Sequence, residues 1–374
     1  MRLNLCYRAA VVAIGMFPIA AFCGPFVQTN LSSDIPMFAA NTDPNLHNPW
    51  GISFSAGSPL WVSDQGTGVS TLYNGAGVAV PLVVSIPTSG PNPPQGPTGQ
   101  VFNSTPSFLL TNGNGQKATF LFDTLGGTIA GWNGGTTAVT QLANPGASYT
   151  GLALGTSGAG DTLYAANFGQ ARIDAVSSTF ADEVLMGNFT VPGLPAGYAP
   201  YNIQNIGGSL YVEFAFVNPV THRASVGAGL GLVAVFDGNG NFVKTLISPG
   251  GALNAPWGIT LAPAVFPVFG GDLLVGNFGD GRINAFDPNT GALLGTLTDA
   301  SNTPISNPGL WGIGFRTAAG FDPASLYFVA GINGENDGLL GSIGPAPEPG
   351  GLTLMVLACG GLLLKKAIGR AAAR

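Results

Sequence analysis

Short hydrophobic runs with a period of two alternate with polar turns along almost the whole chain. In the clearest stretch the runs read PWGITL, DLLVGN, RINAF and LLGTL, with Gly, Asn, Asp or Pro between them. Alternating β-branched and aromatic residues between such turns are typical of β-strands. Between the two ends of the chain, no stretch keeps apolar residues at helical spacing without a Gly or Pro break. The pattern therefore predicts an all-β protein.

Six segments share one order of strands and turns. They begin near residues 48, 106, 149, 200, 255 and 309, and their equivalent positions are Gly51, Phe108, Gly151, Asn202, Gly258 and Gly312. Successive equivalents are 57, 43, 51, 56 and 54 residues apart. Repeats of about 40–50 residues with four strands each are typical of β-propellers. We therefore expect a six-bladed propeller over residues 25–344. A pair of β-sandwiches is the alternative, which the recurring WGI strand opening disfavours.

The N-terminal segment has the pattern of a signal peptide. Arg2 and Arg8 precede an apolar run over residues 9–22, and small residues follow near the expected cleavage site between Ala21 and Gly24. We expect residues 1–24 to form a helix that signal peptidase removes. Cys23 would suit a lipoprotein, but Phe22 stands where a lipobox needs a small residue.

The C-terminal segment, residues 345–374, has the order of a sorting signal. It contains Pro347, Glu348 and Pro349, then an apolar run over 352–364, then Lys365, Lys366, Arg370 and Arg374. This order resembles the PEP-CTERM sorting signal of Gram-negative bacteria, although its basic residues are spread out. The resemblance implies processing by an exosortase-type membrane peptidase. The alternative is an ordinary membrane anchor formed by the same hydrophobic helix. Both place the body outside the cytoplasm, because basic residues stay on the cytoplasmic side.

The body also resembles a known group of proteins. Its fifth repeat is similar to an NHL-type blade. The most specific pieces of the body are NPWGI and WVSDxGTG in the first repeat and VGNFGDGRINAFD in the fifth. Together they resemble an uncharacterised family of secreted bacterial propeller proteins that often carry the same sorting tail. The resemblance implies a fold and a location at the cell envelope or outside the cell. It implies no established activity.

Charge and cysteine usage exclude several classes of function. Between Pro25 and Gly344 there are six basic and 17 acidic residues, a net charge of −11. Without a basic cluster, nucleic-acid binding is not expected. The three cysteines, Cys6, Cys23 and Cys359, all lie in the terminal segments. A body without cysteine has no disulfide framework, thiolate metal site or cysteine nucleophile.

A polar residue ends the second strand of most repeats. These residues are Asp64, Asp123, Asn167, Glu213 and Asn277, with Asn333 as a looser match. Oxygen ligands that converge near one mouth of a propeller could hold Ca²⁺, and NHL-like lactonases use such a central metal. The competing interpretation is that these side chains cap turns through local hydrogen bonds.

Aromatic and histidine positions give further candidates. Trp50, Trp257 and Trp311 recur at strand openings, where they would either stack on a ligand or pack between blades. The only two histidines are His47, which we interpret as structural, and His222, in an insertion of the fourth repeat. Neither belongs to a nucleophile elbow or a zinc-binding pattern.

Three functions follow from the sequence. The first is an exported binding or structural module of the envelope or extracellular matrix. The second is a Ca²⁺-dependent hydrolase of the lactonase or phosphoesterase type that uses the central acidic residues. The third is a peptide- or glycan-binding surface built from the loops at one rim, including residues 217–230. A narrow or plugged channel would favour the first, and four converging oxygen ligands around an open pocket would favour the second.

Overall fold

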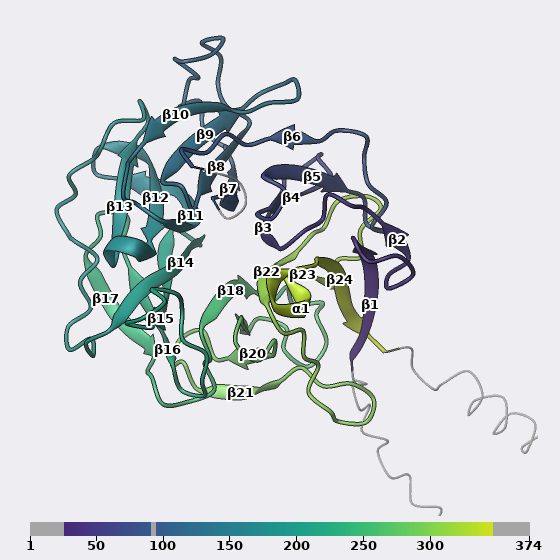
Figure 1. Cartoon of the computed structure of the whole chain (residues 1–374). Coiled ribbons are helices and arrows are strands. Elements are labelled where there is room, and N and C mark those ends of the chain that lie inside the picture. Colours follow the sequence, from purple (N-terminus) through teal and green to yellow (C-terminus); the bar gives the residue numbers. More distant parts are fainter. Residues whose placement is uncertain (1–25, 91–94, 347–374) are drawn as a thin grey trace, which may run out of the picture.

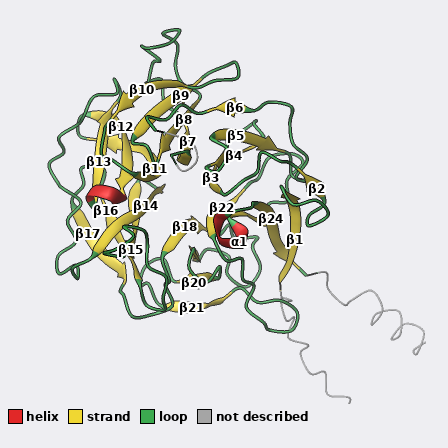
Figure 2. Ribbon diagram, viewed as in Figure 1, coloured by secondary structure: helices red, strands yellow, loops and turns green. Residues whose placement is uncertain are grey.

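The computed structural model describes residues 26–90 and 95–346 of the 374-residue chain. Six β-sheets surround a central axis like the blades of a propeller (Figure 1), and strands form nearly all of the regular structure (Figure 2). The predicted six-bladed all-β propeller is confirmed. The predicted signal helix and C-terminal hydrophobic helix, with the Pro-Glu-Pro motif, lie outside the described residues.

Blades 1 to 5 are antiparallel sheets whose strands follow one another in sequence. Blade 1 contains β3 (Pro49–Ser53), β4 (Leu60–Asp64), β5 (Val69–Tyr73) and β6 (Val84–Ser85). Blade 2 contains β7 (Pro97–Phe102), β8 (Phe120–Thr124), β9 (Thr128–Trp132) and β10 (Val139–Ala143). Blade 3 contains β11 (Tyr149–Ser157), β12 (Gly160–Asn167) and β13 (Arg172–Ser177). Blade 4 contains β14 (Tyr198–Ile206), β15 (Ser209–Phe216), β16 (Gly231–Phe236) and β17 (Phe242–Ile247). Blade 5 contains β18 (Pro256–Leu261), β19 (Leu273–Asn277), β20 (Ile283–Phe286) and β21 (Leu293–Thr296).

Blade 6 is built from both ends of the described chain. It contains β22 (Leu310–Phe315), β23 (Leu326–Ala330), β24 (Leu339–Pro345), β1 (Phe26–Ser33) and the short β2 (Asn41–Thr42). The N-terminal strand β1 pairs antiparallel with the C-terminal strand β24, and Phe26 lies opposite Pro345. This pairing closes the ring. The loop from β2 to β3 is the covalent connection between blade 6 and blade 1.

The hydrophobic core consists of layers between neighbouring blades. Successive side chains of a strand point to opposite faces of its sheet. In β12, Leu163 and Ala165 pack in the layer shared with blade 2, and Tyr164 and Ala166 pack in the layer shared with blade 4. Because both faces of a blade are covered, its central strands are apolar at nearly every position. The repeated hydrophobic runs of the sequence have this origin.

The second repeat begins earlier than the sequence predicted. Its first strand is β7, so Gly99 rather than Phe108 occupies the position equivalent to Gly51. Phe108 lies in the loop between β7 and β8, with a backbone φ of 62° and a fully buried ring. The prediction was wrong because β7 reads PTGQVF. Its proline and polar residues lack the apolar pattern that indicates a strand, although neighbouring strands bury most of it.

Helices are short in the described part of the chain. They are the single turns η1 (Phe168–Gln170) and α1 (Ile332–Glu335), and both follow the second strand of a blade. No helix among the described residues is long and apolar enough to span a bilayer.

Candidate functional site

The inner strands approach so closely that the central channel is nearly closed. A Cβ atom on Gly51 would lie 2.5 Å from the carbonyl oxygen of Thr98, and one on Gly258 would lie 2.4 Å from that of Trp311. Equivalent contacts occur at Gly99, Gly151 and Gly312, each against the next blade. The cavity that remains between these strands is about 40 Å³, little more than one water molecule. The channel is too narrow for a substrate.

Three tryptophans pack together at one end of this channel. The ring of Trp50 stacks on that of Trp311 with centroids 3.5 Å apart, and Trp257 meets both edge-on. The indole N–H of Trp257 donates to the carbonyl oxygen of Thr150 at 2.7 Å, from blade 5 to blade 3. That of Trp311 donates to Asn48 Oδ1 at 3.1 Å. The tryptophans therefore serve mainly as packing between blades, with Trp50 also reaching the surface of a pocket above them.

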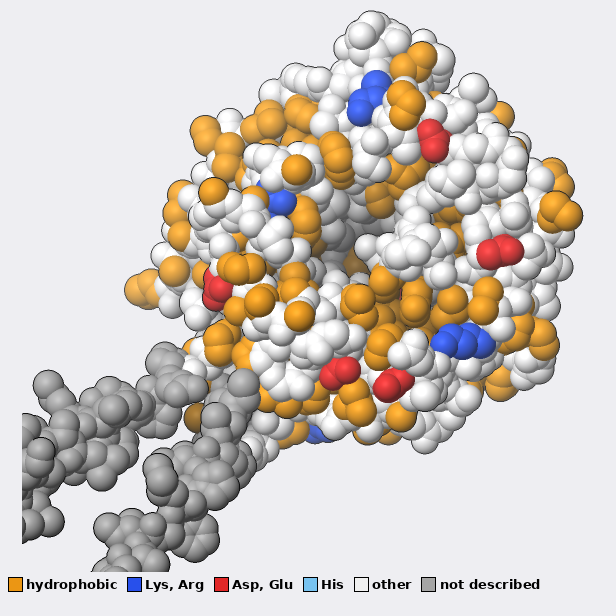
Figure 3. Space-filling view, turned by 180° about the vertical axis from the view of Figure 1, so that it is seen from behind, with side chains coloured by type: hydrophobic (Ala, Val, Ile, Leu, Met, Phe, Trp, Pro, Cys, Tyr) orange, Lys and Arg blue, Asp and Glu red, His pale blue; other side chains and the backbone are white. Residues whose placement is uncertain are grey.

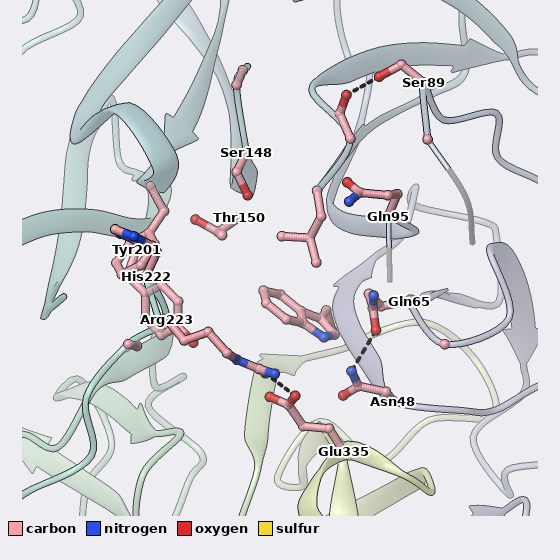
Figure 4. Close-up of a pocket in the computed structure, with 18 of the residues that line it drawn as sticks. Asn48, Gln65, Ser89, Gln95, Ser148, Thr150, Tyr201, His222, Arg223 and Glu335 are labelled. Atoms are coloured by element: carbon pink, nitrogen blue, oxygen red, sulfur yellow. Dashed lines mark hydrogen bonds and ion pairs between the residues drawn. The ribbon is translucent and has the colours of Figure 1, made fainter. Parts of the chain in front are cut away.

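The face on which the inner strands begin carries a pocket of about 1030 Å³, which we call the mouth pocket. Figure 4 shows its labelled side chains arranged around an open centre. Both histidines of the protein line it, together with Arg223, Glu335 and Tyr201. Its remaining labelled polar residues are Asn48, Gln65, Ser89, Gln95, Ser148 and Thr150. Polar side chains and the aromatic rings of Trp50, Phe168 and Tyr201 line the pocket together.

An ion pair lies at one side of the mouth pocket. Arg223, from the long β15–β16 loop of blade 4, binds the Oε2 atom of Glu335, from blade 6 (Figure 4). The side chain of Arg223 is 65% exposed and that of Glu335 only 15%. Glu335 has a φ of 70° and His222 one of 56°, the left-handed region that side chains rarely adopt. Such conformations cost free energy and are enriched at functional sites.

A second set of contacts lies beside Glu335, in the loop that enters blade 1 (Figure 4). Asn48, with a φ of 45°, donates from Nδ2 to Gln65 Oε1 at 2.7 Å. His47 packs against Gly66, where a Cβ atom would lie 1.8 Å from the His47 ring nitrogen Nδ1. That nitrogen is buried and has no hydrogen-bond partner among the described residues. These contacts fix the loop that joins blade 6 to blade 1.

Two of the predicted metal ligands act as turn caps. Asn167 Oδ1 accepts hydrogen bonds from the backbone N–H groups of Ser148 and Gln170, both at 3.2 Å. Asn277 Oδ1 accepts from the N–H of Asn254 at 3.0 Å, and its Nδ2 donates to the Ala252 carbonyl. Both amides join the end of a second strand to the loop that enters the same blade.

The predicted acidic ligands are not at equivalent positions. Asp64, like Asn167 and Asn277, ends its strand and lies opposite the first residue of the inner strand. Asp123 and Glu213 do not end their strands, because Thr124 and Phe214 pair with Pro97 and Pro200 near that end of the inner strand. A shift of one residue turns a side chain to the other face of its sheet. The five residues are therefore divided between opposite blade faces.

The three carboxyls are fully buried. Asp64 accepts a hydrogen bond from Thr71 at 2.6 Å, and Asp123 accepts from Thr98 at 2.8 Å. Neither oxygen of Glu213 has a hydrogen-bond partner among the described residues. Burial raises the pKa of Asp123 to about 7 and raises the pKa values of Asp64 and Glu213 well above their usual range. Their environment favours neutral carboxylic acids.

Within residues 26–90 and 95–346, no group of three or more His, Cys, Asp or Glu side chains is placed to hold a metal ion. Asn333, the looser match, lies in α1 with a φ of 53° and donates to Asp337. The calcium site therefore stays a prediction. Sequence reasoning missed the mouth pocket, because its residues come from loops of different blades. The weak signal was the position of both histidines in loops, His47 before the first strand of blade 1 and His222 in the insertion of the fourth repeat.

The chain is similar in sequence to two proteins of a virus, Acanthamoeba polyphaga mimivirus. No family model matches it. It is 35% identical over 356 residues to the uncharacterized protein R648 of Acanthamoeba polyphaga mimivirus, covering 91% of this chain and 87% of R648. It is 33% identical over 325 residues to the uncharacterized protein L690 of the same virus, covering 84% of each chain. These viral relatives give no support to the bacterial origin that the sorting-signal resemblance implied.

Solved structures show more distant similarity. A streptogramin B lyase matches with a TM-score of 0.47 and 14% identity over 86% of this chain and 98% of that chain. A virginiamycin B lyase from Staphylococcus aureus matches with a TM-score of 0.45 and 14% identity, over 86% and 99% of the two chains. No activity is transferred from either. The sequence identity to R648 and L690 is much higher, at 35% and 33%. This six-bladed β-propeller belongs to the same family as those two proteins.

Proposed function

We propose that the protein is an exported module that binds a carbohydrate ligand in the mouth pocket. The observation that carries this proposal is the contrast between a channel of about 40 Å³ and a mouth pocket of about 1030 Å³. Ligand sites are concave and apolar at the base, with a few placed polar groups. The mouth pocket has this construction, whereas the channel admits no ligand.

The chemistry of the pocket fits a neutral, hydroxyl-rich molecule. Side-chain amides and hydroxyls of Gln65, Gln95, Ser148 and Thr150 both donate and accept hydrogen bonds, as sugar hydroxyl groups do. Arg223 and Glu335 compensate each other's charge. The aromatic surface of Trp50 offers an apolar face at the base. A strongly charged ligand would find no uncompensated side chain of opposite sign in this set.

Export is the second part of the proposal. It is supported by the basic and apolar residues of the segment 1–24 and by the motif order from Pro347 to Lys366. Signal peptidase and an exosortase-type peptidase are the processing partners that these segments suit, and the cell envelope or extracellular space is the expected location. N-terminal sequencing and mass measurement of protein from the envelope fraction test it. A protein that retains residues 1–24 would contradict export by this route.

The hydrolase alternative has no specific support in the described residues. Its expected ligands lie on opposite faces of separate blades, and the inner strands nearly close the channel on which they would converge. The binding module is therefore the function that the geometry favours.

Ligand binding is tested by titrating the full chain with a panel of neutral and uronic-acid oligosaccharides, with calorimetry or tryptophan fluorescence as readout. Arg223→Ala removes a side chain that lines the pocket and leaves the Glu335 carboxylate without its ion-pair partner, so it should weaken binding of a neutral glycan. Arg172→Ala is the matched control, because Arg172 is 56% exposed, pairs with Asp174 and does not line the pocket. The proposal fails if no oligosaccharide binds or if both variants weaken binding equally.

A further inference from the structure

We propose that the face opposite the mouth lies against the lipid bilayer, so that the membrane-anchored form presents the mouth pocket away from the membrane. We call this opposite face the exit face; it contains the turns between the first and second strands of the blades, such as 54–59 and 262–272. The inference rests on the proposed export and sorting, and it concerns the form in which the C-terminal segment holds the body at the membrane before an exosortase-type peptidase processes it. It adds an orientation and an interaction surface.

Strand directions place both described chain ends at the exit face. β24 starts at Leu339, just after the mouth-lining Glu335, and runs to Pro345. β1 is antiparallel to β24 and pairs its first residue, Phe26, with Pro345. The two ends therefore lie side by side at the far end of the same sheet, as the neighbouring β1 and β24 show in Figure 1. A C-terminal anchor can only attach there.

The chain between the propeller and the apolar run is too short to turn the molecule over. Residues 346–351 separate Pro345 from Leu352, and six residues span at most about 20 Å. The seven residues of β24 already extend over about 23 Å. The six residues are therefore shorter than β24 itself. They cannot pass around blade 6, because β1 and β2 lie beside β24. The mouth pocket is therefore held on the side away from the membrane.

Exposed apolar side chains of one loop lie beside the point where the chain leaves the exit face. Phe26 stacks on Phe266 and Phe269, with ring centroids 4.9 and 6.3 Å away, so the loop that joins β18 to β19 lies against the start of β1. The same loop exposes Val265 and Val268, by 62% and 58%. In the view from behind, hydrophobic side chains are spread over the surface with few charged ones between them (Figure 3).

These observations favour lipid as the occupant of this surface. The apolar run over residues 352–364, together with the short tether, brings a bilayer within about 20 Å of the exit face. Valine side chains at the surface gain free energy when they leave water for the interfacial region. The acidic body, with six basic and 17 acidic residues, makes attraction to anionic headgroups unfavourable. A zwitterionic bilayer is therefore the appropriate probe.

The test compares two matched positions in the full chain. Cys6, Cys23 and Cys359 are replaced by alanine, and a fluorescent label is attached to Val268→Cys on the exit face or to Val220→Cys in the mouth-side β15–β16 loop. Val220 is 83% exposed, so both labels attach to surface valines. The protein is inserted into phosphatidylcholine vesicles that carry a headgroup quencher. We expect loss of fluorescence for the Val268→Cys label and little loss for the Val220→Cys label.

The outcomes separate this inference from the proposed function. If the chain does not float with the vesicles, the anchoring proposal fails and the orientation fails with it. If the chain floats but both labels are quenched equally, or the mouth label more, only the orientation is overturned. A chain of residues 25–346, which lacks both apolar segments, should lose the quenching of the Val268→Cys label, and quenching that persists there would overturn the role of the tether.

Discussion

The indole nitrogen of Trp257 lies 2.7 Å from the carbonyl oxygen of Thr150. The two residues belong to the inner strands of blades 5 and 3, so this hydrogen bond joins two blades that are not neighbours in the ring. It is buried, and a buried carbonyl that loses its donor costs more than an exposed one. The bond therefore stabilises the ring as a whole rather than one blade.

Replacing Trp257 by phenylalanine should expose the energetic value of this bond. Trp257→Phe keeps an aromatic ring beside Trp50 but leaves the Thr150 carbonyl unsatisfied, so we expect a loss of about 1–3 kcal/mol in the free energy of unfolding. Urea denaturation measures it. Trp132→Phe is the control, because Trp132 donates to Gly135 within its own exposed turn. Equal losses in the two variants would contradict the role of the central bond.

The glycines of the inner strands should not tolerate a side chain. Gly258→Ala would place a Cβ atom 2.4 Å from the Trp311 carbonyl oxygen, a backbone atom that cannot move freely. We expect destabilisation of about 3 kcal/mol, the upper range for overpacked cores. Gly57→Ala has no atom within 4 Å of its new Cβ and should change stability by no more than about 0.5 kcal/mol. Thermal and urea unfolding of the pair would reveal whether the channel is as tight as its geometry indicates.

Ring closure depends on the first residue of β1. Phe26 is 3% exposed and its neighbour Val27 is 43% exposed. Phe26→Ala should lower the free energy of unfolding by about 3–5 kcal/mol, because a large cavity forms beneath blade 6. Val27→Ala should have a small effect. Hydrogen exchange should show the loss of protection first in β1 and β24; uniform loss over all blades would argue against local opening of the closure.

The buried Asp123 should make stability fall as the pH rises. Burial raises its folded-state pKa to about 7, whereas the unfolded chain has an aspartate pKa near 4. Between about pH 4 and pH 7 the folded state holds this proton more tightly, so its contribution is lost as the pH increases, by about 4 kcal/mol in all. Asp123→Asn removes the titration. Its stability relative to the parent should therefore rise from pH 5 to pH 8 in urea denaturation.

A turn carboxylate of opposite behaviour supplies the control for that measurement. The backbone N–H groups of Thr290 and Asn289 lower the pKa of Asp287, so the parent gains stability as the pH rises through the acid range. Asp287→Asn should lose stability relative to the parent over that range. If the stability difference between Asp123→Asn and the parent stayed constant with pH, Asp123 would not be buried as an acid.

Part of the fold could be predicted because it is local. Short stretches of sequence carry both the alternation of the strands and the recurrence of Gly51, Gly151, Gly258 and Gly312. These two patterns predicted the number of blades. The start of blade 2 could not be predicted, because β7 owes its strand conformation to the neighbours that cover it rather than to its own polar residues. The expected equivalence of the candidate metal ligands was wrong for a related reason. Asp123 and Glu213 differ from Asp64 by one register position, and only strand pairing reveals that.

The sequence by itself determined the class of fold, the number of blades and the separation of an acidic, cysteine-free body from two apolar ends. These properties depend on periodicity and composition, which neighbouring residues carry. Only the tertiary structure decided where chemistry is concentrated. Arg223 and Glu335 are 112 residues apart and meet because the segments that follow the second strands of blades 4 and 6 lie at the same mouth. The pairing of β1 with β24 places both described chain ends at the opposite face.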